Sequence, residues 1–177
     1  MQSLPAWAED LACTLLEDTL PRRWAHVQGV ALQARRLTPA SGADPDLLEA
    51  AAWLHDIGYV PELATIGLHG LDGARYLRDV HQADPMLCRL VAHHSCAVVE
   101  AEERGLANVL QAEFRLPLQL LADALTFCDM TTSPDGMAMT VSSFGPTMTA
   151  SFGPTRRSGD ALNWTHCPVA DKSALSH

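Results

Sequence analysis

Residues 1–136 lack the alternation of apolar and polar positions that marks a half-buried strand, and their apolar stretches follow clear helix starts. Asp44-Pro45 and Asp84-Pro85 each place a capping acid before a proline at the first helical position. Pro5 and Pro21 stand where a first-turn proline is tolerated. We predict helices over about 5–19, 21–37, 45–57, 70–81, 85–95, 97–104 and 117–130. The fold class is therefore all-α, a bundle of about six or seven helices.

The composition of the chain changes near Gly136. Residues 1–136 contain 11 Ser and Thr and carry a formal charge of −10, whereas residues 137–177 also contain 11 Ser and Thr and carry +1. A near-duplication, Ser143-Phe-Gly-Pro-Thr147 and Ser151-Phe-Gly-Pro-Thr155, adds turn chemistry to the second part. We predict one helical domain over 1–136 and an irregular, poorly packed tail over 137–177. A hairpin around 148–152 is the less favoured alternative.

Composition and charge narrow the classes of partner. The chain has 177 residues, a length that suits one domain with a sizeable core. Its formal net charge of −9 disfavours binding to polymeric nucleic acid or to anionic membranes. No apolar run approaches the roughly 20 residues of a membrane span, and the first ten residues lack a basic signal-peptide segment. Five cysteines without a C-x-x-C pair are interpreted as reduced core thiols of a cytoplasmic protein.

Several polar side chains are expected inside this apolar bundle. Residues 47–57 are apolar on nearly every side of a helix, so His55 and Asp56 at its end need a partner or a cation. His26 shares a helical face with apolar residues, and so does Asp129 on a later helix. Asp123 points about 240° away from Asp129 round that helix, so only one of the two enters a given site. For each residue alone, a hydrogen-bonded structural role remains the alternative.

Taken together, these four residues favour a metal site. His26, His55, Asp56 and Asp129 are inward polar groups on three apolar helices, and imidazole with carboxylate suits Mn, Fe, Co, Ni or Zn. His69 opens another helix, and His93 and His94 end the one after it. Adjacent helical residues diverge by about 100°, so His93 and His94 can border one cleft without being equivalent.

This order of residues resembles the HD superfamily of metal-dependent phosphohydrolases. The resemblance spans roughly residues 20 to 136 and rests on five segments in order: Arg23-Trp-Ala-His26-Val-Gln-Gly-Val30, Ala52-Trp-Leu-His-Asp-Ile-Gly58, His69-Gly-Leu-Asp-Gly-Ala74, Val91-Ala-His-His94 and Cys128-Asp-Met-Thr-Thr-Ser-Pro-Asp-Gly136. It implies a helical fold with His26, His55, Asp56 and Asp129 as primary metal ligands. It also implies that His69, His93 and His94 hold a second metal or contact phosphate.

The sequence departs from the family pattern at two positions. Tyr59 follows His-Asp-Ile-Gly, where many members carry lysine. Ser95 follows His93-His94, where the branch that cleaves cyclic dinucleotides has an acidic residue. That branch is therefore disfavoured.

The resemblance implies an enzyme that hydrolyses a small phosphoester or phosphoanhydride, a nucleotide among the candidates. Asp56, His93 and His94 are the expected catalytic residues, with His93 or His94 stabilising the leaving group as a protonated imidazole. Four ligands suffice for one firmly bound divalent ion, and a second ion is expected to be weaker or absent. Arg22 and Arg23 are expected to be solvated and are left out of the site. The alternative function is a metal-containing module that senses a nucleotide without turnover.

Overall fold

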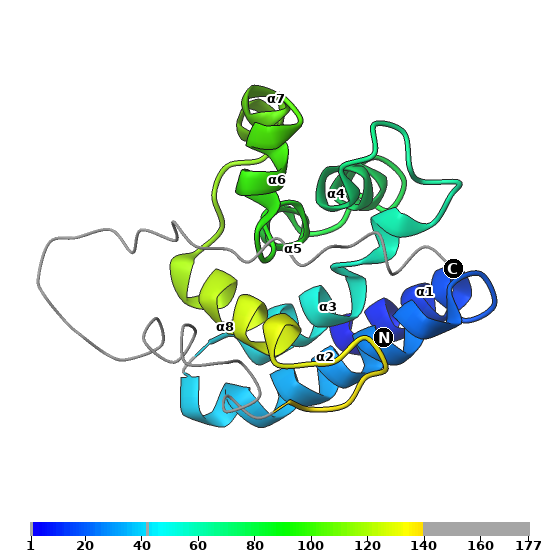
Figure 1. The fold of residues 1–177 in the computed structure, drawn as a ribbon. Helices are drawn as coiled ribbons and strands as arrows, with labels where there is room; N and C mark the ends of the chain where they lie inside the picture. Colours follow the sequence, from blue (N-terminus) through cyan, green and yellow to red (C-terminus); the bar gives the residue numbers. More distant parts are fainter. Residues whose placement is uncertain (1, 42, 140–177) are drawn as a thin grey trace, which may run out of the picture.

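The computed structural model describes residues 2–41 and 43–139, without the side chains of 38–41. These residues form eight α-helices and one short 3₁₀ helix (Figure 1). The helices are α1 (Leu4–Leu16), α2 (Pro21–Ser41), α3 (Pro45–Leu54), α4 (His69–Asp79), α5 (Pro85–Ala92), α6 (Ala97–Glu103), α7 (Ala107–Glu113) and α8 (Gln119–Met130). The 3₁₀ helix η1 (Ile57–Tyr59) follows α3. The all-α prediction is confirmed. Of the predicted tail over 137–177, the residues from 140 onward lie outside the described residues.

Acidic caps start two of the helices as the sequence predicts. Asp44 accepts hydrogen bonds from the backbone N–H groups of Asp46 and Leu47 at 3.1 and 3.2 Å. Asp84 accepts from those of Met86 and Leu87 at 2.7 and 3.3 Å. The first N–H groups of a helix have no hydrogen-bond partner within the helix, so each cap supplies an acceptor for two of these backbone donors.

Helix α7 is absent from the predicted set, although the other seven helices are present. It spans only seven residues and its apolar signal is sparse, with Leu110 as its one buried side chain. Leu106, Leu110 and Phe114 recur at four-residue spacing, and Gly105 stands before them. This spacing was the signal that could have revealed the helix.

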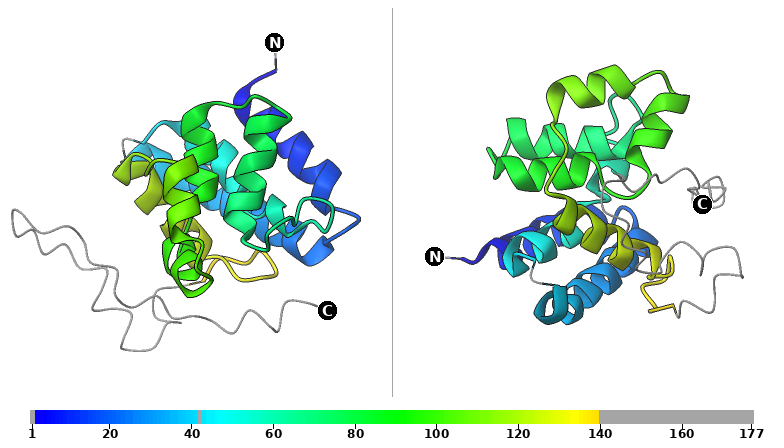
Figure 2. Two further views of the ribbon diagram at one scale, coloured as in Figure 1. Left: turned by 90° about the horizontal axis from the view of Figure 1, so that it is seen from above. Right: turned by 90° about the vertical axis from the view of Figure 1, so that its left-hand side faces the viewer.

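The helices form two layers that meet at α3. One layer contains α1, α2, α3 and α8, and the other contains α4 to α7 (Figure 2, right). Helix α3 packs against α1, α2, α5 and α8, so it belongs to the centre of the molecule. All residues from 50 to 58 are buried. Ala50, Ala51 and Ala52 are fully buried, and these small side chains let the neighbouring helices approach α3 closely.

Helices α1, α3 and α5 each end three residues earlier than predicted, and histidines follow the early ends of α3 and α5. The predicted helix 45–57 stops at Leu54, and the predicted helix 85–95 stops at Ala92. Asp56 and His93 have φ near −100° and ψ near 0°, which is not helical. In each case an imidazole caps the helix: His55 Nδ1 lies 2.9 Å from Ala52 O, and His94 Nδ1 lies 2.7 Å from Val91 O. These rings satisfy carbonyls that a continuing helix would have bonded.

The segment after α8 folds back onto α2. A single antiparallel bridge joins Thr132 and Ala138, and the Gly136 N–H donates to Ser133 O at 2.9 Å. Gly136 has φ +77°, and a Cβ built on it would lie 2.2 Å from Ala25 O. Only glycine fits this contact, which brings residues 133–136 against the first turns of α2.

The thiols differ in part from the prediction. Cys13, Cys88 and Cys128 are free, as expected. Cys96 lies half-buried in the connection between α5 and α6 and not in the core. Cys167 lies outside the described residues. None of the helices in the described ranges combines the length and apolar character needed to cross a bilayer.

We predict that Gly58→Ala destabilises the protein strongly. A Cβ at this position would lie 1.9 Å from His69 O and 2.7 Å from Gly73 N, so η1 and α4 would have to separate. Forced overpacking of this kind lowers the free energy of unfolding by about 3 kcal/mol, measurable by urea denaturation. The control is Gly105→Ala, where φ is +69° but no atom lies within 4 Å. It should cost only the left-handed backbone strain, about 1 kcal/mol. Equal losses in the two variants would contradict the prediction.

Candidate metal centre

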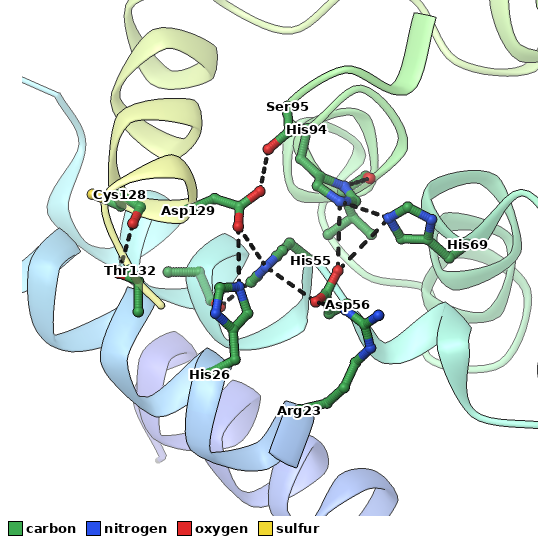
Figure 3. A network of polar contacts seen from close by, with 12 residues as sticks. Arg23, His26, His55, Asp56, His69, His94, Ser95, Cys128, Asp129 and Thr132 are labelled. Carbon is green, nitrogen blue, oxygen red and sulfur yellow. Dashed lines mark hydrogen bonds and ion pairs between the residues drawn. The ribbon is translucent and has the colours of Figure 1, made fainter. Parts of the chain in front are cut away.

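Six polar side chains from both layers converge between α3 and its neighbours (Figure 3). Four were expected as primary ligands and two as second-site residues. They are His26 on α2, His55 and Asp56 after α3, His69 at the start of α4, His94 after α5 and Asp129 on α8. Their donor atoms form two groups of three, each with all atoms within 4.8 Å of one another.

The first group contains His26, His55 and Asp129. His26 Nε2 lies 3.0 Å from Asp129 Oδ1, and His55 Nε2 lies 3.7 Å from the same oxygen. The His55 side chain is fully buried, and the Asp129 side chain is 18% exposed. One residue on α2, one after α3 and one on α8 therefore each place a donor atom within 4.8 Å of the other two.

The second group contains Asp56, His69 and His94. Asp56 Oδ1 lies 3.7 Å from His69 Nε2 and 3.7 Å from His94 Nε2. The two imidazole nitrogens are 3.0 Å apart. All three residues are buried.

Asp56 stands between the groups. Its Oδ1 faces the second group, and its Oδ2 lies 3.6 Å from His55 Nε2 in the first. Because one oxygen faces each group, this carboxylate can contribute a ligand to both groups.

Backbone carbonyls orient three of the four imidazoles in the same way. The Nδ1 atoms of His55, His94 and His26 lie 2.9, 2.7 and 3.0 Å from the carbonyl oxygens of Ala52, Val91 and Ser133. A carbonyl only accepts, so Nδ1 carries the proton and Nε2 keeps its lone pair in the neutral ring. Every one of these Nε2 atoms faces the carboxylates.

Two residues considered in the sequence lie outside both groups. His93 Nε2 donates to Phe114 O at 2.7 Å, so the ring is engaged with the end of α7. Asp123 accepts a hydrogen bond from Gln119 at 2.7 Å on the exposed side of α8. Its exclusion in favour of Asp129 agrees with the angular argument from the sequence.

Arg23 lies at the edge of the centre, although the sequence predicts that it is solvated. Its Nη1 donates to Asp56 Oδ2 at 2.6 Å, and its guanidinium lies 3.4 Å from the centroid of the Tyr59 ring. Tyr59 in turn stacks on His69, with ring centroids 4.0 Å apart. Arg22 forms an ion pair with Asp135 at 2.9 Å and is half exposed, as expected for a solvated residue. The sequence alone does not show which of these two adjacent arginines reaches the centre.

Two further polar residues contact the centre from the connection between α5 and α6 and from α6 itself. Ser95 Oγ donates to Asp129 Oδ2. Glu100 Oε2 lies 3.6 Å from His69 Nδ1, and Glu100 also pairs with Arg104 at 2.9 Å. The sequence indicates no role at the centre for Glu100 or for Ser95, which it marks only as a departure from the family pattern, because each residue acts on a partner about 30 residues away in the chain.

Opposite charges within the centre favour the ionised forms of Asp56, Asp129 and His26. Burial alone would raise the pKa of Asp56, but His55 and Arg23 hold it well below its usual range. Burial would likewise raise the pKa of Asp129, and its hydrogen bond with His26 lowers it instead. Burial lowers the pKa of His26, yet the Asp129 hydrogen bond outweighs this and raises it to about 8. Both carboxylates are therefore ionised at neutral pH.

The adjacent His93 and His94 are held in the neutral form. Burial, followed by the charge of His55, lowers the pKa of His94 to about 4. Burial also lowers the pKa of His93. Neutral imidazole is the form that ligates a metal, and it is not the form that donates a proton to a leaving group.

The donor set fits a divalent transition metal. His55 Nε2 is buried and has no hydrogen-bond partner among the described residues, and it faces two ionised carboxylates. An unpaired acceptor beside two anions is unfavourable unless a cation lies between them. Imidazole with carboxylate suits the ions from Mn to Zn, whereas Ca²⁺ and Mg²⁺ prefer oxygen ligands.

The comparisons with known proteins agree with this geometry. The family model described as HD domain matches residues 23–129, which is more than half of the chain. The matched span begins at Arg23, ends at Asp129 and contains all six residues of the two groups. No curated protein and no solved structure matches the chain significantly.

We predict a pH-dependent loss of stability in the metal-free protein. The pKa of His26 rises from 6.5 to about 8 on folding, so its stabilising contribution is complete below pH 6.5 and lost as the pH rises through 8. The loss is about 2 kcal/mol in the free energy of unfolding, measured by urea denaturation of chelator-treated protein. His26→Asn should abolish this loss, whereas His81→Asn should keep it. An unchanged pH profile in His26→Asn would contradict the prediction.

Proposed function

The chain belongs to the HD domain family, and from this membership and the geometry of the centre we propose that it is a metal-dependent phosphohydrolase. Its substrate would be a small phosphoester or phosphoanhydride, with nucleotides among the candidates. The proposed primary ligands are His26, His55, Asp56 and Asp129. His69 and His94 are the proposed ligands of a second ion, for which Asp56 is the shared carboxylate.

One observation carries this proposal. Three imidazoles use Nδ1 on backbone carbonyls and direct Nε2 toward two ionised carboxylates. A purely structural histidine generally uses both ring nitrogens in hydrogen bonds, whereas His55 Nε2 is buried and has no hydrogen-bond partner among the described residues. The same carbonyl–histidine arrangement is the usual support of metal ligands, since it fixes the tautomer and the ring plane.

Different residues of the centre would have different roles in such an enzyme. When bound, a divalent ion lowers the pKa of a coordinated water from 15.7 toward about 7, which supplies a nucleophile for attack on phosphorus. Asp56 and Asp129 supply the negative charge that holds the cation, and the neutral ring of His94 serves as a ligand. Leu54 and Ile57, which flank His55 and Asp56 in the chain, are fully buried and give this side of the centre an apolar surrounding.

Arg23 is the proposed phosphate contact. Its side chain is only 16% exposed and already pairs with a carboxylate of the centre, so its charge lies where phosphoryl oxygens would arrive. This revises the sequence-level expectation that Arg23 is solvated. His93, bound to Phe114 O, is proposed to fix the chain beside His94 instead of acting on the leaving group.

The proposal is tested by metal content and turnover together. The purified protein should contain one or two transition-metal ions and should release phosphate from at least one member of a panel of nucleotides and other small phosphoesters. Removal of the metal with a chelator should abolish turnover, and its return should restore turnover. A protein that binds metal and nucleotide but hydrolyses nothing would support the sensing alternative.

We predict that Asp56→Ala abolishes metal binding and turnover. The substitution removes the carboxylate shared by both groups, which is also the anion that Arg23 and His94 face. The matched control is Asp123→Ala, which removes a carboxylate from α8 outside the centre and should leave the metal content unchanged. Loss of metal in Asp123→Ala with retention in Asp129→Ala would show that the last ligand has been assigned to the wrong aspartate.

We predict that the second group sets the number of ions. If two ions bind, His69→Ala and His94→Ala should each lower the metal content from about two per chain to about one, because each removes a donor from the second group. His93→Ala is the control, since this ring lies outside both groups. Metal content is measured by elemental analysis after dialysis. Two ions retained in both the His69 and His94 variants would mean that other residues supply the second site.

A further inference from the structure

Ser95 has an unfavourable backbone conformation for its residue type. It follows His94 directly and has φ +49°, in the left-handed region that favours glycine. The other non-glycine residue with positive φ in the described part of the chain is Gln82, which lies in the exposed turn after α4. A strained backbone persists only where the surrounding structure enforces it, and such positions cluster at functional sites.

The Ser95 side chain explains why serine occupies this position. Its Oγ donates a hydrogen bond to Asp129 Oδ2, as Figure 3 shows. The other carboxylate oxygen, Oδ1, faces His26 Nε2 at 3.0 Å and His55 Nε2 at 3.7 Å. One oxygen of Asp129 is thereby held away from the first group while the other is directed into it.

Ser95 also joins the two groups through the chain. Its neighbour His94 belongs to the second group, and the residue that it contacts, Asp129, belongs to the first. Asp129 lies on α8 in one layer, whereas the connection between α5 and α6 belongs to the other. The hydrogen bond therefore crosses between the layers beside the metal ligands.

We propose that Ser95 is a positioning residue for the metal centre: its hydroxyl holds Asp129 so that a single carboxylate oxygen, Oδ1, serves the first ion. This inference rests on the proposed function, because it requires the first group to bind a metal. Glycine would relieve the backbone strain but could not hold the carboxylate. The strain at residue 95 is thus the cost of having a hydroxyl there.

The test compares Co²⁺ binding with the stability of the metal-free protein in three variants. Ser95→Ala removes the hydroxyl and keeps the strain, whereas Ser95→Gly removes both. Ser95→Thr keeps the hydroxyl and increases the strain, since a β-branched residue fits this region poorly. Co²⁺ affinity is measured by titration of its visible absorption, which also reports the ligand geometry. Stability is measured as the melting temperature after chelation.

The proposal predicts that affinity and stability separate. Ser95→Ala and Ser95→Gly should both bind the first Co²⁺ about 10- to 100-fold more weakly, the usual effect of losing a group that orients a metal ligand. Their melting temperatures should nevertheless differ, with Ser95→Gly the more stable. Ser95→Thr should be the least stable of the three variants and should bind Co²⁺ most like the parent protein.

The opposite results are equally clear. If affinity follows the melting temperature, so that Ser95→Gly binds Co²⁺ like the parent protein, Ser95 is only a structural residue and the proposal is wrong. Should Ser95→Thr fail to fold, the comparison of Ser95→Ala with Ser95→Gly still decides. A parent protein that binds no Co²⁺ overturns the metal centre itself, whereas a parent that binds it as tightly as Ser95→Ala overturns the role of Ser95 alone.

Discussion

The hydrogen bond from a histidine Nδ1–H to a backbone carbonyl is the interaction on which this molecule's centre depends. At the ends of α3 and α5 it satisfies a helix carbonyl, and in the same contact it fixes the ring of His55 or His94. A third bond of this kind links His26 to Ser133 in the segment after α8. Helix termination and ligand orientation are therefore one event, because the ring that ends the helix is the ring that faces the carboxylates.

The position of the centre follows from the burial of α3. A helix that packs on four others ends inside the molecule, so the polar residues at its end are removed from water. Such a cluster is unfavourable unless its charges are paired, and Asp56 and Asp129 are each surrounded by cationic or imidazole groups. The close packing of η1 on α4 at Gly58 brings His69 into the same cluster. The apolar core thus determines where the polar chemistry occurs.

The sequence predicted what depends on local signals and missed what depends on contacts across the fold. Asp44-Pro45 and Asp84-Pro85 located two helix starts because caps and prolines act within one turn. The order of His and Asp residues identified the family, whose model matches the chain. The early ends of α3 and α5 were missed because a histidine, and not a glycine, ends each helix. Ser95 was missed because its partner lies 34 residues away, and α7 because a seven-residue helix leaves little periodicity.

The division of the centre between the two layers affects how readily the protein opens and is degraded. His26 and Asp129 come from one layer and His69 and His94 from the other, with Asp56 between them. An ion held by these residues would link the two layers and stabilise their contact, in addition to any catalytic role. Opening would then require release of the ion, and an emptied molecule would expose its interior more often to proteases. The concentration of free metal would in this way affect the rate at which the protein is degraded, whether or not substrate is present.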